Sequence, residues 1–261
     1  MASLLFYDNP VALNKETHQK IKVNAGTNDF SFAKQTNSVV LAGVEFTEAA
    51  KEYPIVFAEA GESMVPVALL GLRNEENLFI DDKNGWDARY VPAFVRRYPF
   101  VLATGEDATQ QVVCIDESFS GFNDESGEAL FGDDGEPAPL LTKALEFLEE
   151  YQKQYLRTGQ FIQRLKENDL LQNLNAKVDL VNGQQFSLTG LLIVDEKKLL
   201  ALSDESALAF FKTGELAWVY CHLMSLGNMS AMVDRIAKII NKVEEKVEEK
   251  GKAEAEAEAK K

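Results

Sequence analysis

The sequence predicts an α+β fold, with a mostly antiparallel sheet in the N-terminal half and helices plus β-hairpins in the C-terminal half. Two observations carry this prediction. Short apolar runs alternate with turn-forming residues up to about residue 115, whereas apolar residues recur at helical spacing from Pro139 onward. The 261 residues, 46% of them hydrophobic, are enough to bury a core in either one large or two small domains.

The N-terminal half shows the sequence pattern of a β-sheet, in which turn-forming residues separate short apolar runs. Clusters of Asn, Asp and Gly separate the apolar runs, as expected for strands joined by tight turns. The runs are Pro54–Ala58, Val65–Leu72, Leu78–Ile80, Phe100–Leu102 and Val112–Ile115. Pro92 and Pro99 interrupt the segment from Tyr90 to Leu102, so this segment is not expected to be one central strand.

The acidic residues are unevenly distributed. The formal net charge is −15, and the window 106–136 contains ten carboxylates, four glycines and no Lys or Arg. We expect this window to be a solvated, mobile surface loop; a calcium site is the alternative, although the ligand spacing of an EF-hand is missing. The sequence is therefore divided into a β-rich region 1–136 that ends in the acidic loop 106–136, a helix-and-hairpin region 137–249, which can form one compact domain with the first, and a disordered tail 250–261.

The C-terminal half begins with an amphipathic helix. Pro139 suits its first turn, and the apolar positions follow at steps of three and four residues. These positions are Leu141, Leu145, Leu148, Tyr151, Tyr155, Ile162 and Leu165.

Two hairpins and further helices follow. Around Asn182 and Gly183, a three-residue loop that pairs Val178 with Phe186 gathers the apolar side chains on one face. A second hairpin is expected from Leu191–Val194 and Leu199–Leu202. Ser203 is a good N-cap for a short helix over 204–212 that stops at Gly214.

The last helical stretch is expected to begin near Glu215 and to continue to about Val247. It carries an a/d heptad pattern. Its apolar positions are Leu226, Met229, Val233, Ile236, Ile240, Val243 and Val247. This helix can pack on its own domain or pair with a partner, including a second copy of the chain.

Motifs for catalysis or metal binding are missing from the sequence. It has no glycine-rich phosphate loop, dinucleotide fingerprint, zinc motif or nucleophile elbow. His18 is expected to be exposed and His222 to be structural, while Cys114 and Cys221 are read as small buried hydrophobes. We therefore predict no catalytic residue, metal or cofactor.

The segment from 81 to 98 is the best candidate for a binding site. In a strongly acidic chain, it concentrates aromatic rings and guanidinium groups, which bind carboxylates bidentately and stack on rings. The candidate residues are Trp86, Arg89, Tyr90, Arg96 and Arg97. A peptide carboxylate or an acidic partner segment would suit them. Alternatively, these arginines neutralise Asp81, Asp82, Asp87 or the acidic loop.

Several short segments together resemble the SapC-like family of bacterial proteins, which is distinct from the membrane permease of the same name. The segments are Tyr53–Phe57, Val65–Arg73, Glu76–Asp81, Gly85–Trp86 and Tyr90–Phe100. The resemblance extends over roughly residues 10 to 240. The family is named for a surface-array (S-layer) locus, and its genes occur beside those of flavin-dependent halogenase-like and outer-membrane proteins.

This resemblance implies an accessory or binding protein with a protein or peptide partner, such as a halogenase-like or envelope protein, and it carries over no catalytic residue. The alternative is an unrecognised enzyme that uses carboxylates and arginines on a small molecule or peptide. The negative charge disfavours nucleic acid as a partner, and the longest apolar run, Val65–Leu70, is too short to span a membrane. Without a recognisable secretory signal and with only two cysteines, the chain is expected to be cytoplasmic.

Overall fold

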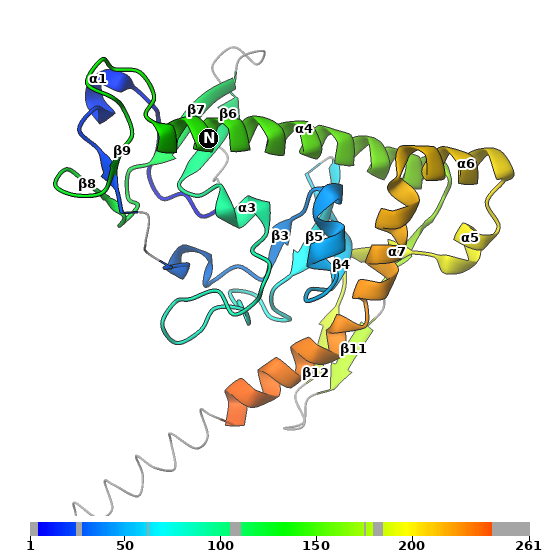
Figure 1. Ribbon diagram of the computed structural model, residues 1–261. Helices are drawn as coiled ribbons and strands as arrows, with labels where there is room; N and C mark the ends of the chain where they lie inside the picture. Colours follow the sequence, from blue (N-terminus) through cyan, green and yellow to red (C-terminus); the bar gives the residue numbers. More distant parts are fainter. Residues whose placement is uncertain are drawn as a thin grey trace, which may run out of the picture.

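A computed structural model of the protein describes residues 5–24, 28–61, 63–104, 111–174, 176–179 and 185–241. It confirms the predicted α+β fold. The antiparallel sheets come mainly from the N-terminal half and the helices mainly from the C-terminal half (Figure 1).

The largest sheet has five antiparallel strands in the order β10-β13-β4-β5-β3. Their bounds are β3 Ser38–Val40, β4 Ile55–Ala60, β5 Ser63–Leu69, β10 Leu171–Asn173 and β13 Leu191–Val194. The central strands β4 and β5 are rich in buried apolar residues. Because β10 and β13 come from the C-terminal half, the two halves of the chain share this sheet and the main hydrophobic core beside it.

Two smaller sheets and the first turns of the long helix α4 form a second core. The sheet β1-β7-β6 combines Pro10–Ala12, Gln111–Asp116 and Phe100–Thr104, and the sheet β8-β2-β9 combines Phe122–Asn123, Lys22–Val23 and Glu128–Ala129. The predicted acidic loop thus holds three strands within its described part, residues 111–136. The reason is that apolar residues stand between the acids: Ile115, Leu130 and Phe131 are buried in the second core.

The short elements between these strands are α1 Lys15–His18, η1 Ser31–Ala33, η2 Gly43–Glu45, α2 Phe46–Ala49 and α3 Ala93–Arg96. As expected from the two prolines, the segment from 90 to 102 is interrupted: α3 follows Pro92, and β6 begins after Pro99. The strand expected at Leu78–Ile80 is wrong, because the Asn77 side chain accepts a hydrogen bond from the Phe79 N–H and forms a local turn.

The predicted amphipathic helix is confirmed as α4, Pro139–Glu167, with Pro139 in its first turn. It runs past both the β6–β7 hairpin and the main sheet (Figure 1). Its buried apolar face joins the two cores. Near its C-terminal end, the Arg164 Nε donates to the buried carboxylate of Glu215 at 2.6 Å, which ties α4 to the C-terminal helices.

One hairpin prediction is confirmed in register and the other is wrong. β11, Ala176–Asp179, pairs with β12, Gln185–Leu188, and places Val178 opposite Phe186; the turn itself lies outside the described residues. The second expected hairpin is instead β13 followed by α5, Glu196–Leu200. The Asp195 carboxylate caps this helix by accepting from the N–H groups of Lys197 and Lys198, which favours a helix over a turn.

The next helix, α6 Asp204–Thr213, is confirmed together with its Ser203 cap and its stop at Gly214, where φ is 76°. The last helical stretch is broken into α7, Glu215–Ser225, and a helix over residues 228–241. Met232 and Ile236 are fully buried, so this helix packs on its own chain. The later heptad positions, the partner-pairing hypothesis for them and the tail 250–261 fall outside the described residues. None of the helices in the described part is long and apolar enough to cross a membrane.

Candidate functional site

Residues 86–97, which we call the arginine arch, contain the predicted site residues and are held by side chains from the segment 45–53. The Glu52 carboxylate accepts hydrogen bonds from the main-chain N–H groups of Arg89, at 2.9 Å, and Tyr90, at 3.1 Å. The Tyr53 hydroxyl donates to the carbonyl oxygen of Tyr90. The side chains of Glu52 and Tyr53 therefore fix the main chain of the arch at Arg89 and Tyr90.

Glu45 is a buried support of the arch. Its Oε1 accepts from the Tyr90 hydroxyl and from the Ala93 N–H, both at 2.7 Å, and its Oε2 accepts from the Ala42 N–H at 2.7 Å. Burial raises the pKa of this carboxyl, and its hydrogen bonds and the charge of Arg96 offset that effect only in part. Glu45 thus positions the chain that carries the arginines.

Two of the five predicted site residues point into the protein. Trp86 is 9% exposed; its Nε1 donates to the Tyr53 hydroxyl at 2.8 Å. Arg97 is half-buried, with its guanidinium 3.9 Å from the ring centre of Phe94 and 5.4 Å from that of Tyr151. Its Nε is buried without a hydrogen-bond partner. These two residues therefore contact the inside of the protein, and Tyr90 is half-buried.

Arg89 and Arg96 are exposed on the arch. The Arg96 Nε donates to the Val91 carbonyl at 2.9 Å, and its guanidinium lies 5.7 Å from the ring centre of Tyr90 and 5.1 Å from that of Phe147 on α4. Within the described ranges, neither arginine has a carboxylate within ion-pair distance.

Two of the aspartates that the arginines were expected to neutralise in the alternative interpretation, Asp81 and Asp87, are engaged by other groups. Asp87 pairs instead with Arg235, at 2.6 Å, and the Asp81 carboxylate accepts from the N–H groups of Lys83 and Gly85. Among the described residues, neither of these two carboxylates therefore pairs with Arg89 or Arg96.

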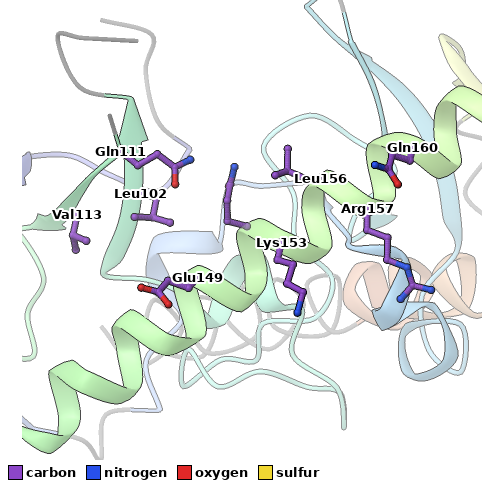
Figure 2. A pocket seen from close by; sticks show the side chains of 9 residues that line it. Leu102, Gln111, Val113, Glu149, Lys153, Leu156, Arg157 and Gln160 are labelled. Carbon is purple, nitrogen blue, oxygen red and sulfur yellow. The ribbon is translucent and has the colours of Figure 1, made fainter. Parts of the chain in front are cut away.

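A groove that the sequence reasoning missed lies on the other side of α4, between this helix and the β6–β7 hairpin (Figure 2). Its volume is about 620 Å³, within the range of ligand sites. It is lined by Leu102, Gln111, Val113, Glu149, Gln152, Lys153, Leu156, Arg157 and Gln160. The only sequence signal was Leu156, an apolar residue on the polar face of the predicted helix.

His18 is buried, contrary to the expected exposure. Asn14 caps α1, and the His18 Nδ1 accepts from the Asn14 N–H at 2.9 Å while the Nε2 lies 3.2 Å from the Glu117 carboxylate. Both ring nitrogens are therefore used in holding the N-terminal segment.

His222 is structural, as expected. Its Nδ1 donates to the Ile55 carbonyl at 2.8 Å, and its Nε2 accepts from the Val194 N–H at 3.0 Å. The register of β4 and β13 would place Ile55 opposite Val194, so the imidazole stands between two groups that would otherwise pair directly. Burial lowers the pKa of His222 to about 4.

The cysteines Cys114 and Cys221 are free and half-buried, less buried than expected. Among the residues that the structure describes, there is also no cluster of three or more His, Cys, Asp or Glu that could hold a metal ion.

A sequence model of the SapC family matches residues 13–232. The chain belongs to the SapC family. The match covers most of the chain, including the arginine arch and the groove. No curated protein and no solved structure matches the chain significantly.

In this SapC-family protein, the segments through which the sequence resembles the family have a common structural role. Tyr53–Phe57 and Val65–Arg73 contain the first half of β4 and most of β5, respectively, and Tyr90–Phe100 contains α3 and most of the arch. Tyr53 connects the two, because its hydroxyl contacts both Trp86 and Tyr90. The family resemblance therefore rests largely on the central strands and on the loop that they support.

Proposed function

We propose that this SapC-family protein is a non-catalytic, cytoplasmic binding protein that holds an acidic segment of a partner protein through Arg89 and Arg96. The family resemblance favours as partner an envelope component linked to the surface layer, or a modifying enzyme such as a flavin-dependent halogenase-like protein. The protein would then act as an accessory to that partner.

The main support for this proposal is the set of contacts around the Arg96 side chain. Stacking on Tyr90 and Phe147 and the Nε bond to Val91 limit the freedom of this side chain. No carboxylate of the described residues lies within ion-pair distance of it, although its charge acts on Glu45 from farther away. A restrained guanidinium loses less conformational entropy when it forms a bidentate pair. In a chain with a net charge of −15, its exposure supports a role in recognition.

The enzyme alternative calls for a carboxyl group of raised pKa inside a pocket. Glu45 has the raised pKa, yet both of its oxygens are occupied by protein donors and it does not line the groove. Its contacts fit an anchor for the arch, which supports the binding function.

The test begins by recovering the partner with an affinity-tagged chain from a bacterium that encodes the protein, followed by mass spectrometry. The affinity of the purified pair is then measured by calorimetry. We expect Arg96→Ala to weaken binding about tenfold, and the double variant with Arg89→Ala to weaken it further, because each change removes a charge-assisted contact.

Lys166→Ala is the matched control. Lys166 is an exposed cation on α4, about 28 Å along the helix from Phe147. Its loss should leave the affinity unchanged. Equal affinity of the wild type and the double arginine variant would refute the arch as the binding site, and turnover of a substrate by the purified protein would refute the non-catalytic function.

A further inference from the structure

The groove beside α4 is the open end of the second hydrophobic core. On the face of the β6–β7 hairpin that packs on α4, the cross-strand pair Phe100–Ile115 is buried, whereas the next pair on that face, Leu102–Val113, lines the groove. Helix α4 shows the same change, because Leu148 is buried but Leu156, about two turns later, is 60% exposed. Hairpin and helix thus present apolar side chains to a shared space that none of the described residues fills.

The outer edge of β6 offers main-chain groups at the same place. The Leu13 N–H donates to the Val113 carbonyl, so the main chain of Val113 faces β1. Because neighbouring residues of a strand point their main-chain groups to opposite sides, the Val101 and Ala103 groups face β7 and those of Leu102 face outward. Among the described strands, none pairs with this edge. An extended chain could therefore pair with β6 at Leu102.

The charges along the groove give it a direction. Lys153 and Arg157 flank Leu156 along α4, while Glu149 lies toward the hairpin end, below Leu102 in the view of Figure 2. Both cations keep donors for an anion: Lys153 has an exposed pair with Glu150 at 3.6 Å, and Arg157, whose guanidinium lies 4.6 Å from the ring centre of Trp218, uses one NH₂ on the Thr213 carbonyl.

We propose that this groove binds an extended peptide segment of a partner protein in which apolar and acidic residues alternate. Its apolar side chains would fill the space between Leu102, Val113 and Leu156. Its carboxylates would lie toward Lys153 and Arg157, and its main chain would pair with β6. This site is separate from the arginine arch and does not depend on the function proposed for it.

The test uses two fluorescein-labelled nonapeptides, one alternating valine with glutamate and one alternating valine with lysine, titrated with the full chain at physiological salt and followed by fluorescence anisotropy. We expect saturable binding of the glutamate peptide and at least tenfold weaker binding of the lysine peptide. Leu156→Glu should weaken binding of the glutamate peptide at least tenfold, because it places a charge in the apolar part of the groove. Lys153→Glu should weaken it by a similar factor.

Leu208→Glu is the matched control, since Leu208 is a 50% exposed leucine on α6, outside the groove. This control should bind the glutamate peptide like the wild type. The proposal is overturned by absence of saturable binding, by equal binding of both peptides, or by full affinity in Leu156→Glu. It is also overturned if sedimentation shows a dimer that Leu156→Glu dissociates, because a second copy would then occupy the groove.

Discussion

Asp116 and Glu45 are buried carboxylates in different regions of the protein, and each holds a neighbouring segment by accepting hydrogen bonds from it. The pKa of Asp116 is lowered, whereas that of Glu45 is raised. Asp116 lies at the end of β7, where it holds the N-terminal segment, and Glu45 lies under the arginine arch. Burial raises the pKa of both, but for Asp116 hydrogen bonds outweigh burial and the pKa falls below its usual value. For Glu45 burial prevails and the pKa is raised.

The number of donors contributes to the difference, together with the stronger effect of burial on Glu45. Asp116 accepts five hydrogen bonds, from the N–H groups of Asp8, Asn9 and Ser118 and from the hydroxyls of Ser118 and Tyr98. Glu45 accepts three. A buried carboxylate with many donors stabilises its charged form, whereas one with fewer donors remains a cost to the fold. Asp116 thus holds the N-terminal segment strongly, whereas the carboxylate of Glu45 holds the arch more weakly.

The largest effect is expected for Asp116→Asn. An amide NH₂ would face two or three of the five donors that now meet an oxygen, so we expect a loss of about 3.5 kcal/mol in the free energy of unfolding. Urea denaturation at pH 7 measures it. A loss below about 1 kcal/mol would contradict the role of Asp116 as the stronger anchor.

The second prediction concerns the pH dependence of the free energy of unfolding, to which the buried His222 contributes at acidic pH. Its pKa of about 4 lies below the usual 6.5, so the unfolded chain binds the proton more readily. The stability contributed by neutral His222 is complete above pH 6.5 and is lost as pH falls toward 4, by about 3 kcal/mol.

Comparison with His222→Gln isolates this contribution, since the glutamine amide can donate to Ile55 and accept from Val194 without titrating. The unfolding free energy of the wild type should fall more steeply between pH 6.5 and 4 than that of the variant. Parallel curves would contradict the buried neutral state of His222.

Much of the fold could be predicted because local sequence signals agreed with the final packing. The register of Val178 with Phe186, the Ser203 cap and the Gly214 stop all follow from residues close together in the sequence. The second hairpin failed because the capping ability of Asp195 competes with turn formation, and sequence patterning alone did not reveal which would win.

The candidate site was less predictable because it depends on long-range contacts. The cluster from Trp86 to Arg97 is evident in the sequence, but which guanidinium groups face outward depends on distant partners. The guanidinium groups of Arg96 and Arg97 stack on Phe147 and Tyr151 of α4, respectively. Asp87 forms an ion pair with Arg235. The groove depends on how far a hairpin and a helix diverge, which no local pattern encodes.

The third prediction uses two tyrosines that each donate to one of the carboxylates. The Tyr90 hydroxyl lies 2.7 Å from Glu45, which has two other donors, and the Tyr98 hydroxyl lies 3.2 Å from Asp116, which has four others. We expect Tyr90→Phe to cost about 1.5 kcal/mol and Tyr98→Phe about 0.5 kcal/mol. Denaturation of both variants at pH 7 measures the ratio. A larger cost for Tyr98→Phe would show that donor number does not explain the contrast.

The last prediction concerns Glu45→Gln, for which we expect the stability at pH 7 to change by no more than about 1 kcal/mol. The amide loses the bond from the Ala42 N–H but also removes a costly buried charge. Its pH dependence is the sharper readout. Because the folded-state pKa of Glu45 is raised above 4.5, the native protein binds the proton more readily, and its stability should decline as pH rises from 4.5 through that pKa. The difference in unfolding free energy between wild type and variant should therefore shift against the wild type over this window. A shift in the opposite direction would mean that the protein stabilises Glu45 as a carboxylate, like Asp116, and that the arch is held as firmly as the N-terminal segment at Asp116.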